Sequence, residues 1–180
     1  MADNNEILGE GLSIDANARL PSNNNFLFEH CFKFQLERLP NTTFFCQSVN
    51  MPGMSIGVAK QPTRFGIEYK WPGNVATIED LRIGFVVDED LANYIEIRNW
   101  MRSILPMNGF DEMLEHSRQY FSEATLFLLN SAKQPNKRVQ FKNCFPVNLS
   151  GIQFSSTNDD DTPKLADCTF MFSDFEIEDV

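Results

Sequence analysis

The sequence predicts a mainly β protein, a β-sandwich or rolled β-barrel of about seven to eight strands with one flanking α-helix. Two observations lead to this expectation. Short segments in which apolar and polar residues alternate recur along the chain, as half-buried strands require. Only one long segment has the helical period, so a single long helix is available to cover a sheet.

That helix follows directly from a strand. Up to residue 87 the apolar residues of residues 81 to 105 fall on every second position, and beyond residue 90 they recur three or four apart: Leu91, Tyr94, Ile97, Met101 and Ile104. A helix is therefore expected at about residues 90 to 105. The acids Asp88, Glu89 and Asp90 are expected to cap its free N–H groups. Aromatic residues at this spacing, including Trp100, indicate core packing rather than a binding platform.

The remaining strands are expected to be short and separated by turn residues. Pro40 and Asn41 mark one turn, and Pro146 is expected to end another strand. A short helix is predicted within residues 110 to 119. The further strands are predicted at residues 26–39, 42–49, 123–130, 138–144, 147–154 and 164–177.

The domain organisation follows from composition. Residues 1–25 are polar and acidic and are expected to form an N-terminal arm, and residues 26–180 are expected to form a single β domain. Within it, residues 55–77 are interrupted by proline and glycine and predict a long loop. Its aromatic residues are expected either to fold back onto the sheet or to dock on another subunit; they are Phe65, Tyr69 and Trp71.

Length, charge and cysteine spacing restrict the function. The 180 residues suit one domain, and no apolar segment reaches the roughly 18 residues that a membrane span needs. The first residues lack the apolar core of a signal peptide, so a cytoplasm-like compartment is expected. The formal charge of −10 disfavours a phosphate-gripping surface, and the four dispersed cysteines are expected to be buried, reduced thiols.

No motif in the sequence predicts catalysis. Asp159, Asp160 and Asp161 lack the spacing of a calcium loop and indicate an exposed turn. The acids at 88 to 90 are adjacent in sequence, so their side chains point in different directions. The two carboxyl groups of a glycosidase must instead face each other across a cleft. With two histidines and no nucleophile motif, we expect no enzyme activity, no catalytic or metal-binding residue, and no cofactor.

The order of features resembles the tail-tube protein family of contractile-tailed, T4-like bacteriophages. The resemblance covers roughly residues 26 to 177 and consists of short pieces that match in order. These pieces are Phe32–Leu36, Phe44–Gly53, Pro72–Asn74, Leu81–Asp90, Asn93–Trp100, Phe141–Val147 and Thr169–Phe172.

The resemblance implies a virion protein that is assembled in the host cytoplasm and located in the tail. Members of the family form hexameric rings whose strands join into one inner barrel, and the rings stack into a tube. The chain is therefore expected to be a tail tube subunit around a negatively charged channel, through which DNA passes without specific binding. The alternatives within the family are a tube terminator, or tail-completion protein, and a baseplate tube initiator. Tail sheath, baseplate or neck proteins are the expected partners.

Two sets of residues are candidates for these roles. Subunit or ring contacts are expected from Phe65, Tyr69, Trp71 and Asn74. Lumen or rim charge is expected from Asp159, Asp160, Asp161, Asp167 and Asp174, because acids repel DNA phosphates. From a different class, a monomeric β-sandwich binding module stays open, with Tyr69 and Trp71 as its binding platform.

Overall fold

The computed structural model describes residues 25–64, 66–105, 120–155 and 162–180. The N-terminal arm up to residue 24 and the short helix predicted within residues 110 to 119 lie outside these ranges. The described elements are β1 (Phe32–Leu36), α1 (Pro40–Phe44), β2 (Cys46–Val49), β3 (Met54–Pro62), β4 (Glu68–Ile78), β5 (Leu81–Val86), α2 (Ala92–Ile104), β6 (Ser122–Leu129), β7 (Pro135–Leu149), β8 (Leu165–Met171) and β9 (Asp174–Asp179).

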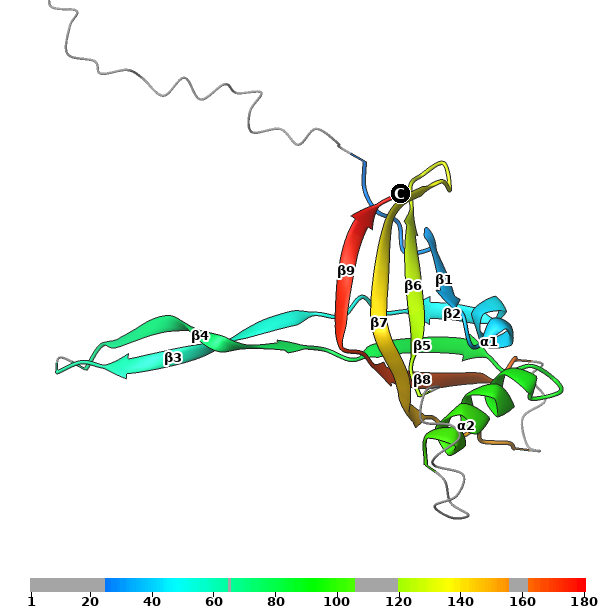
Figure 1. Ribbon diagram of the computed structural model, residues 1–180. Helices are drawn as coiled ribbons and strands as arrows, with labels where there is room; N and C mark the ends of the chain where they lie inside the picture. Colours follow the sequence, from blue (N-terminus) through cyan, green and yellow to red (C-terminus); the bar gives the residue numbers. More distant parts are fainter. Residues whose placement is uncertain (1–24, 65, 106–119, 156–161) are drawn as a thin grey trace, which may run out of the picture.

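Seven of these strands form one antiparallel sheet that folds over into two layers (Figure 1). One layer contains β1, β6, the first part of β7 and β9, and the other contains the end of β7, β8, β5 and β2. The predicted mainly β class with one long helix is confirmed. β1 and β2 are the strands at the two ends of the sheet order, and they do not pair with each other. The described part of the subunit is therefore not a closed barrel.

Strand β7 belongs to both layers. Its residues up to Cys144 pair with β6, and those from Phe145 pair with β8. The change of partner coincides with a positive φ of 55° at Asn143 and a register shift between Pro146 and Asn148. The prediction that Pro146 ends the strand was therefore wrong. Proline has no backbone N–H to donate to a neighbouring strand, but it is tolerated where the pairing is already irregular.

The core lies between the layers, with α2 at one end. It is built from alternate residues of the paired strands and from Ile97 and Trp100 of α2. The Trp100 ring lies 5.9 Å from the ring of Phe170, and its indole N–H donates to the carbonyl oxygen of Tyr120 at 3.1 Å. Trp100 is therefore a core residue, as its helical spacing indicates.

The start of α2 differs from the sequence expectation. None of the acids at 88 to 90 caps the helix; Leu91 precedes it in the left-handed region at φ 56°. Instead, the fully buried side chain of Asn93 connects the start of the helix to the end of β5 by hydrogen bonds. Its amide group donates to the Val86 carbonyl oxygen at 2.7 Å, and its side-chain oxygen accepts from the Tyr94 backbone N–H at 2.8 Å. A buried amide thus joins the strand end to the first helical turn.

Replacing Asn93 with alanine is expected to lower the free energy of unfolding by about 1–3 kcal/mol, because the partly buried Val86 carbonyl would lose its hydrogen-bond donor. Urea unfolding followed by circular dichroism measures this change. Asn136→Ala, at an exposed position, is the matched control and should change stability by less than about 0.5 kcal/mol. Equal stability of the two variants would contradict the assigned role.

Three further boundaries correct the sequence prediction. Residues 42 to 44 are helical rather than extended, because Pro40 occupies the first turn of α1, where its missing N–H costs nothing. The first strand begins at Phe32, after a turn in which the Cys31 N–H donates to the Phe28 carbonyl. The predicted last strand is two strands, since Ser173 redirects the chain and its N–H donates to the Lys142 carbonyl at 2.9 Å.

Candidate assembly surfaces

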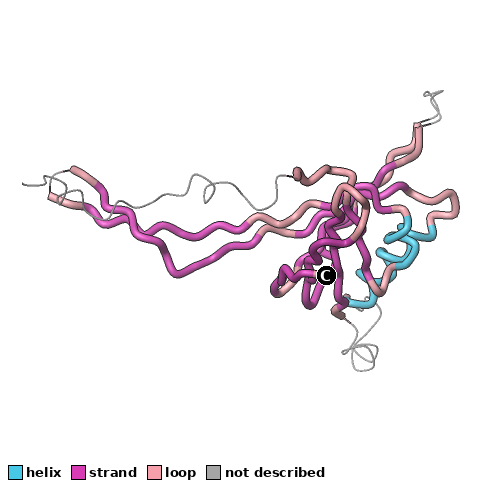
Figure 2. Tube along the Cα trace, turned by 90° about the horizontal axis from the view of Figure 1, so that it is seen from above, coloured by secondary structure: helices cyan, strands magenta, loops and turns pink. Residues whose placement is uncertain are grey.

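The largest departure from a compact body is a projecting hairpin, residues 54 to 78. Its strands β3 and β4 pair only with each other in the described chain and extend away from the two-layered body (Figures 1 and 2). The long loop predicted at residues 55–77 was therefore wrong. Both faces of this ribbon are exposed, so no buried face imposes an alternating pattern, and Pro72 is tolerated because β4 has a free edge.

Large apolar side chains cover the projecting hairpin. Near the body Ile56 lies opposite Ala76, and farther out Ala59 lies opposite Trp71. Tyr69 and Trp71 are 61% and 58% exposed. The exposed apolar set of the hairpin is Met54, Ile56, Val58, Ile67, Tyr69, Trp71 and Val75. An exposed set of this size is typical of a protein–protein contact surface.

The structure places the predicted contact residues on one strand. Tyr69, Trp71 and Asn74 all belong to β4 and are exposed, and Phe65 lies outside the described residues. Asn74 follows Gly73 at the place where the register shifts between Ile56 and Val58. A Cβ on Gly73 would lie 2.6 Å from the Gly57 carbonyl oxygen, so only glycine allows this close approach of the two strands.

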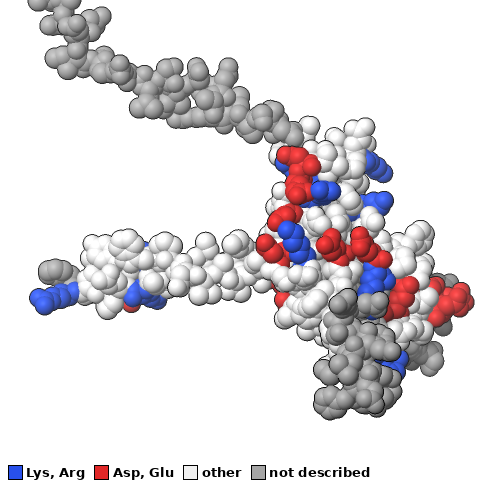
Figure 3. Space-filling view, viewed as in Figure 1, with Lys and Arg blue, Asp and Glu red and all other residues white. Residues whose placement is uncertain are grey.

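The projecting hairpin is basic although the chain is acidic. It carries Lys60, Arg64 and Lys70 against one acid, Glu68, whereas the whole chain has a formal charge of −10. Figure 3 shows basic side chains at the outer end of the hairpin, and both acidic and basic side chains on the body. Lys60 lies 3.7 Å from Glu68 in an exposed ion pair. The outer end is thus suited to an acidic partner surface.

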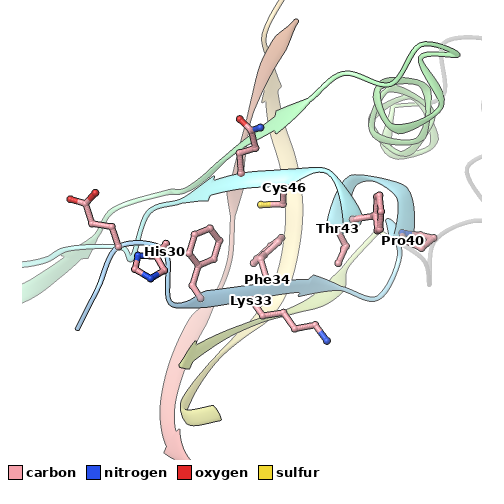
Figure 4. Close-up of a pocket in the computed structure, with 10 residues that line it drawn as sticks. His30, Lys33, Phe34, Pro40, Thr43 and Cys46 are labelled. Atoms are coloured by element: carbon pink, nitrogen blue, oxygen red, sulfur yellow. The ribbon is translucent and has the colours of Figure 1, made fainter. Parts of the chain in front are cut away.

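A groove lies on the body where β1 and β2 approach without pairing. Its first part has a volume of about 810 Å³ (Figure 4). Phe34 and Cys46 point into the space between the two strands, and Lys33 points away from it. The lining residues of this part are Glu29, His30, Phe32, Lys33, Phe34, Pro40, Thr43, Phe44, Cys46 and Gln47.

The groove continues past Phe32 and Gln47 into a second hollow of about 460 Å³, where Val49, Met51 and Leu128 line it. Large exposed apolar residues border both parts; Phe44 is 81% exposed. This groove was not predicted from the sequence, because the phenylalanines before and within β1 alternate like core residues. The signal that could have found it is the aromatic pair Phe44 and Phe45, because two adjacent extended residues do not both face one core, so one large aromatic ring is left exposed.

The candidate lumen acids do not form one cluster in the described chain. Asp167 is an exposed residue of β8 on the outer face of its layer, in a shallow hollow that Asp80 and Arg82 also line. Asp174 begins β9 in the other layer and lies opposite Lys142 in the register. Asp159, Asp160 and Asp161 lie outside the described residues.

The acids of β9 face basic residues of β7. Lys137 pairs with Asp179, Arg138 with Glu178, and Lys142 with Glu176. The Arg138 guanidinium also donates to Glu178 at 2.7 Å, and the hydrogen bond from Lys142 to Glu176 raises the pKa of that lysine. These acids are locally neutralised, so they add little to the long-range negative field of the protein.

The four cysteines are unpaired, and all but the half-buried Cys46 are buried. Burial raises the thiol pKa from 9.0 to about 11 in Cys46 and about 12 in Cys144. These thiols are therefore protonated at neutral pH and suited to packing. Among the described residues no cluster of three or more histidine, cysteine or acidic side chains could hold a metal ion. None of the helices in the described ranges has the length and apolar composition needed to cross a membrane.

The described chain is an open two-layer β fold with one long helix and a projecting hairpin. The chain belongs to the phage tail tube protein family, whose family model matches residues 18–178. It is therefore a structural component of a virion tail. The tail tube terminator protein of Enterobacteria phage T4 is 28% identical to it over 140 residues, which are 76% of this chain and 78% of the relative.

Solved structures share the fold. The tube-terminating cap of the anti-feeding prophage has a TM-score of 0.63 at 14% identity, over 93% of this chain and all of the cap protein. The sheath/tube terminator of an extracellular contractile injection system has a TM-score of 0.60 at 18% identity, over 85% of this chain and 96% of its own. A chain of the sheath–tube complex of such a system has a TM-score of 0.57 at 19% identity, over 86% and 93%.

Proposed function

We propose that the protein forms the ring that terminates the tail tube, and that its role is structural, without catalytic activity. The observation that carries this proposal is the 28% identity to a tail tube terminator over three quarters of the chain. The alternative role from the sequence analysis is thus better supported than that of a main tube subunit. Sheath or neck proteins are the partners that a ring at the end of the tube would contact.

A hexameric ring with a central channel completes the proposal. The open order of the sheet supports it, because β1 and β2 stand at its two ends and each leaves one edge, unpaired in the described chain, that assembly would cover. Asp167 is the described candidate for the channel wall, since it is exposed on the outer face of its layer. An acidic wall repels DNA phosphates and favours passage over binding.

Electron microscopy of the purified protein, alone and mixed with tail tubes of the same phage, tests the function. A terminator is expected to form single rings that do not stack, and to add one ring at one end of each tube. Long tubes formed by the protein alone would establish a main tube subunit instead. A protein that stays monomeric and does not bind to tube ends would favour the alternative of a monomeric β-sandwich binding module.

A further inference from the structure

We propose that the projecting hairpin of one copy lies in the groove between β1 and β2 of the next copy, so that identical head-to-tail junctions close the ring. This inference deepens the proposed function and rests on ring formation, but it names the surfaces that make the contact. The partner is a second copy of this chain. Its outer hairpin residues Tyr69 and Trp71 pack against the aromatic lining of the groove.

The surfaces of the hairpin and the groove match in chemical character. The exposed apolar residues of the hairpin have no apolar surface to cover within the described chain, since none of them belongs to the hydrophobic core or its partly buried rim. The groove has aromatic walls and an exposed aromatic border at Phe28 and Phe44. Burying both surfaces against each other removes two apolar patches from water at once.

Both the hairpin and the strands beside the groove would gain stability from the contact. A two-stranded hairpin is only marginally stable on its own in water, because it lacks a core on either face. The nine residues of β3 are all exposed, and at about 3.3 Å per residue they project roughly 30 Å. The strands beside the groove are also incomplete: β1 pairs only with β6, and β2 only with β5, among the described residues. A ribbon placed between them would have backbone edges available on both sides.

The positions of the hairpin and the groove on the subunit suit a head-to-tail contact. The hairpin continues the line of β2 and β5 out of one side of the body, whereas α1, which borders the groove, lies on the opposite side (Figures 1 and 2). The hairpin and the groove are therefore different surfaces, and the end of the groove at α1 lies on the side away from the hairpin. Such a contact is heterologous, and it generates a closed ring when the rotation between copies returns to the start.

Charge supports the same arrangement. Lys60, Arg64 and Lys70 would approach Glu29, which lines both parts of the groove, whereas Lys33 in the first part points away from the space between the strands (Figure 4). A hairpin directed at another hairpin would instead bring basic residues together. The charge distribution thus favours hairpin-to-body over hairpin-to-hairpin contact.

Disulfide cross-linking of rings tests the junction. The variant carries Gln61→Cys on the hairpin and Gln47→Cys in the groove, two exposed polar positions that leave Tyr69 and Trp71 intact. Oxidation is expected to give a ladder of covalent multimers that ends at the closed ring, at least tenfold above the control. The control combines Gln61→Cys with Glu176→Cys on β9, which β6 and β7 separate from β1. Each single variant measures the background from the native thiols.

The outcomes separate this inference from the proposed function. Rings that form normally but cross-link no better than the control would overturn the junction and leave the terminator role intact. A cross-link within one chain would also overturn it, because the groove would then hold the hairpin of its own copy. Failure of every variant and of the unchanged protein to form rings would overturn the proposed function together with the junction.

Discussion

A variant that lacks the projecting hairpin is expected to fold normally and to remain monomeric at every concentration. In this variant Asn-Gly replaces residues 55 to 77, so that a two-residue turn joins Met54 to Ile78, which already lie opposite each other in the register. No residue of the removed segment belongs to the hydrophobic core. The free energy of unfolding should therefore change little, while the surface proposed to join the copies is lost.

Light scattering and urea unfolding, measured on the same preparation, check this expectation. Ser55→Ala is the matched control, because it changes only an exposed hydrogen bond at the base of the hairpin and should leave assembly intact. Ring formation by the shortened protein would show that the hairpin is dispensable. An unfolded product would show that the hairpin contributes to the stability of the body, contrary to the exposure of its residues.

Replacing Phe141 with alanine is expected to have the largest effect on stability, a loss of about 3–5 kcal/mol. Phe141 is fully buried on β7, where Ala124 lies opposite on β6 and Phe175 opposite on β9. Its ring lies 5.1 Å from that of Phe172 and 6.1 Å from that of Phe175. Removing it leaves a cavity beside the strand that connects the two layers.

The midpoint of urea unfolding measures this loss. Phe154→Ala, at a position that is 75% exposed, removes the same ring from the surface and should cost less than about 0.5 kcal/mol. A loss of 1 kcal/mol or less in Phe141→Ala would mean that the surrounding side chains collapse into the space, and that the junction of the layers is not closely packed.

The strands of the body could be predicted because burial imposes a pattern on them. In β5 the alternating residues Leu81, Ile83 and Phe85 are all buried, and the period of α2 places Ile97 and Trp100 against the sheet. The helix start could not be predicted in the same way. The acids at 88 to 90 resemble caps in the sequence, but the backbone places Asn93 where the connection to β5 is made.

The projecting hairpin and the groove could be predicted from the sequence less well than the strands of the body. The hairpin strands expose both faces, so their pairing leaves no periodic signal, and proline and glycine suggest a loop. The contact role proposed for Tyr69 and Trp71 remains a prediction. The groove depends on how β1 and β2 approach in space, and strand order cannot be read from local patterns. Because strand order could not be predicted, the placement of the candidate acids Asp167 and Asp174 in different layers could not be predicted either.

The way the hairpin is rooted also determines how the subunit would bear mechanical load. Residues 53 and 79 join it to β2 and β5, and it leaves the body along the direction of these strands (Figure 1). A pull on its outer end therefore acts parallel to the strands. The hydrogen bonds between β5 and its neighbours β2 and β8 then share the force in shear, instead of opening one after another as in peeling. Resistance to sliding of these strands sets the force that the subunit can withstand at its hairpin.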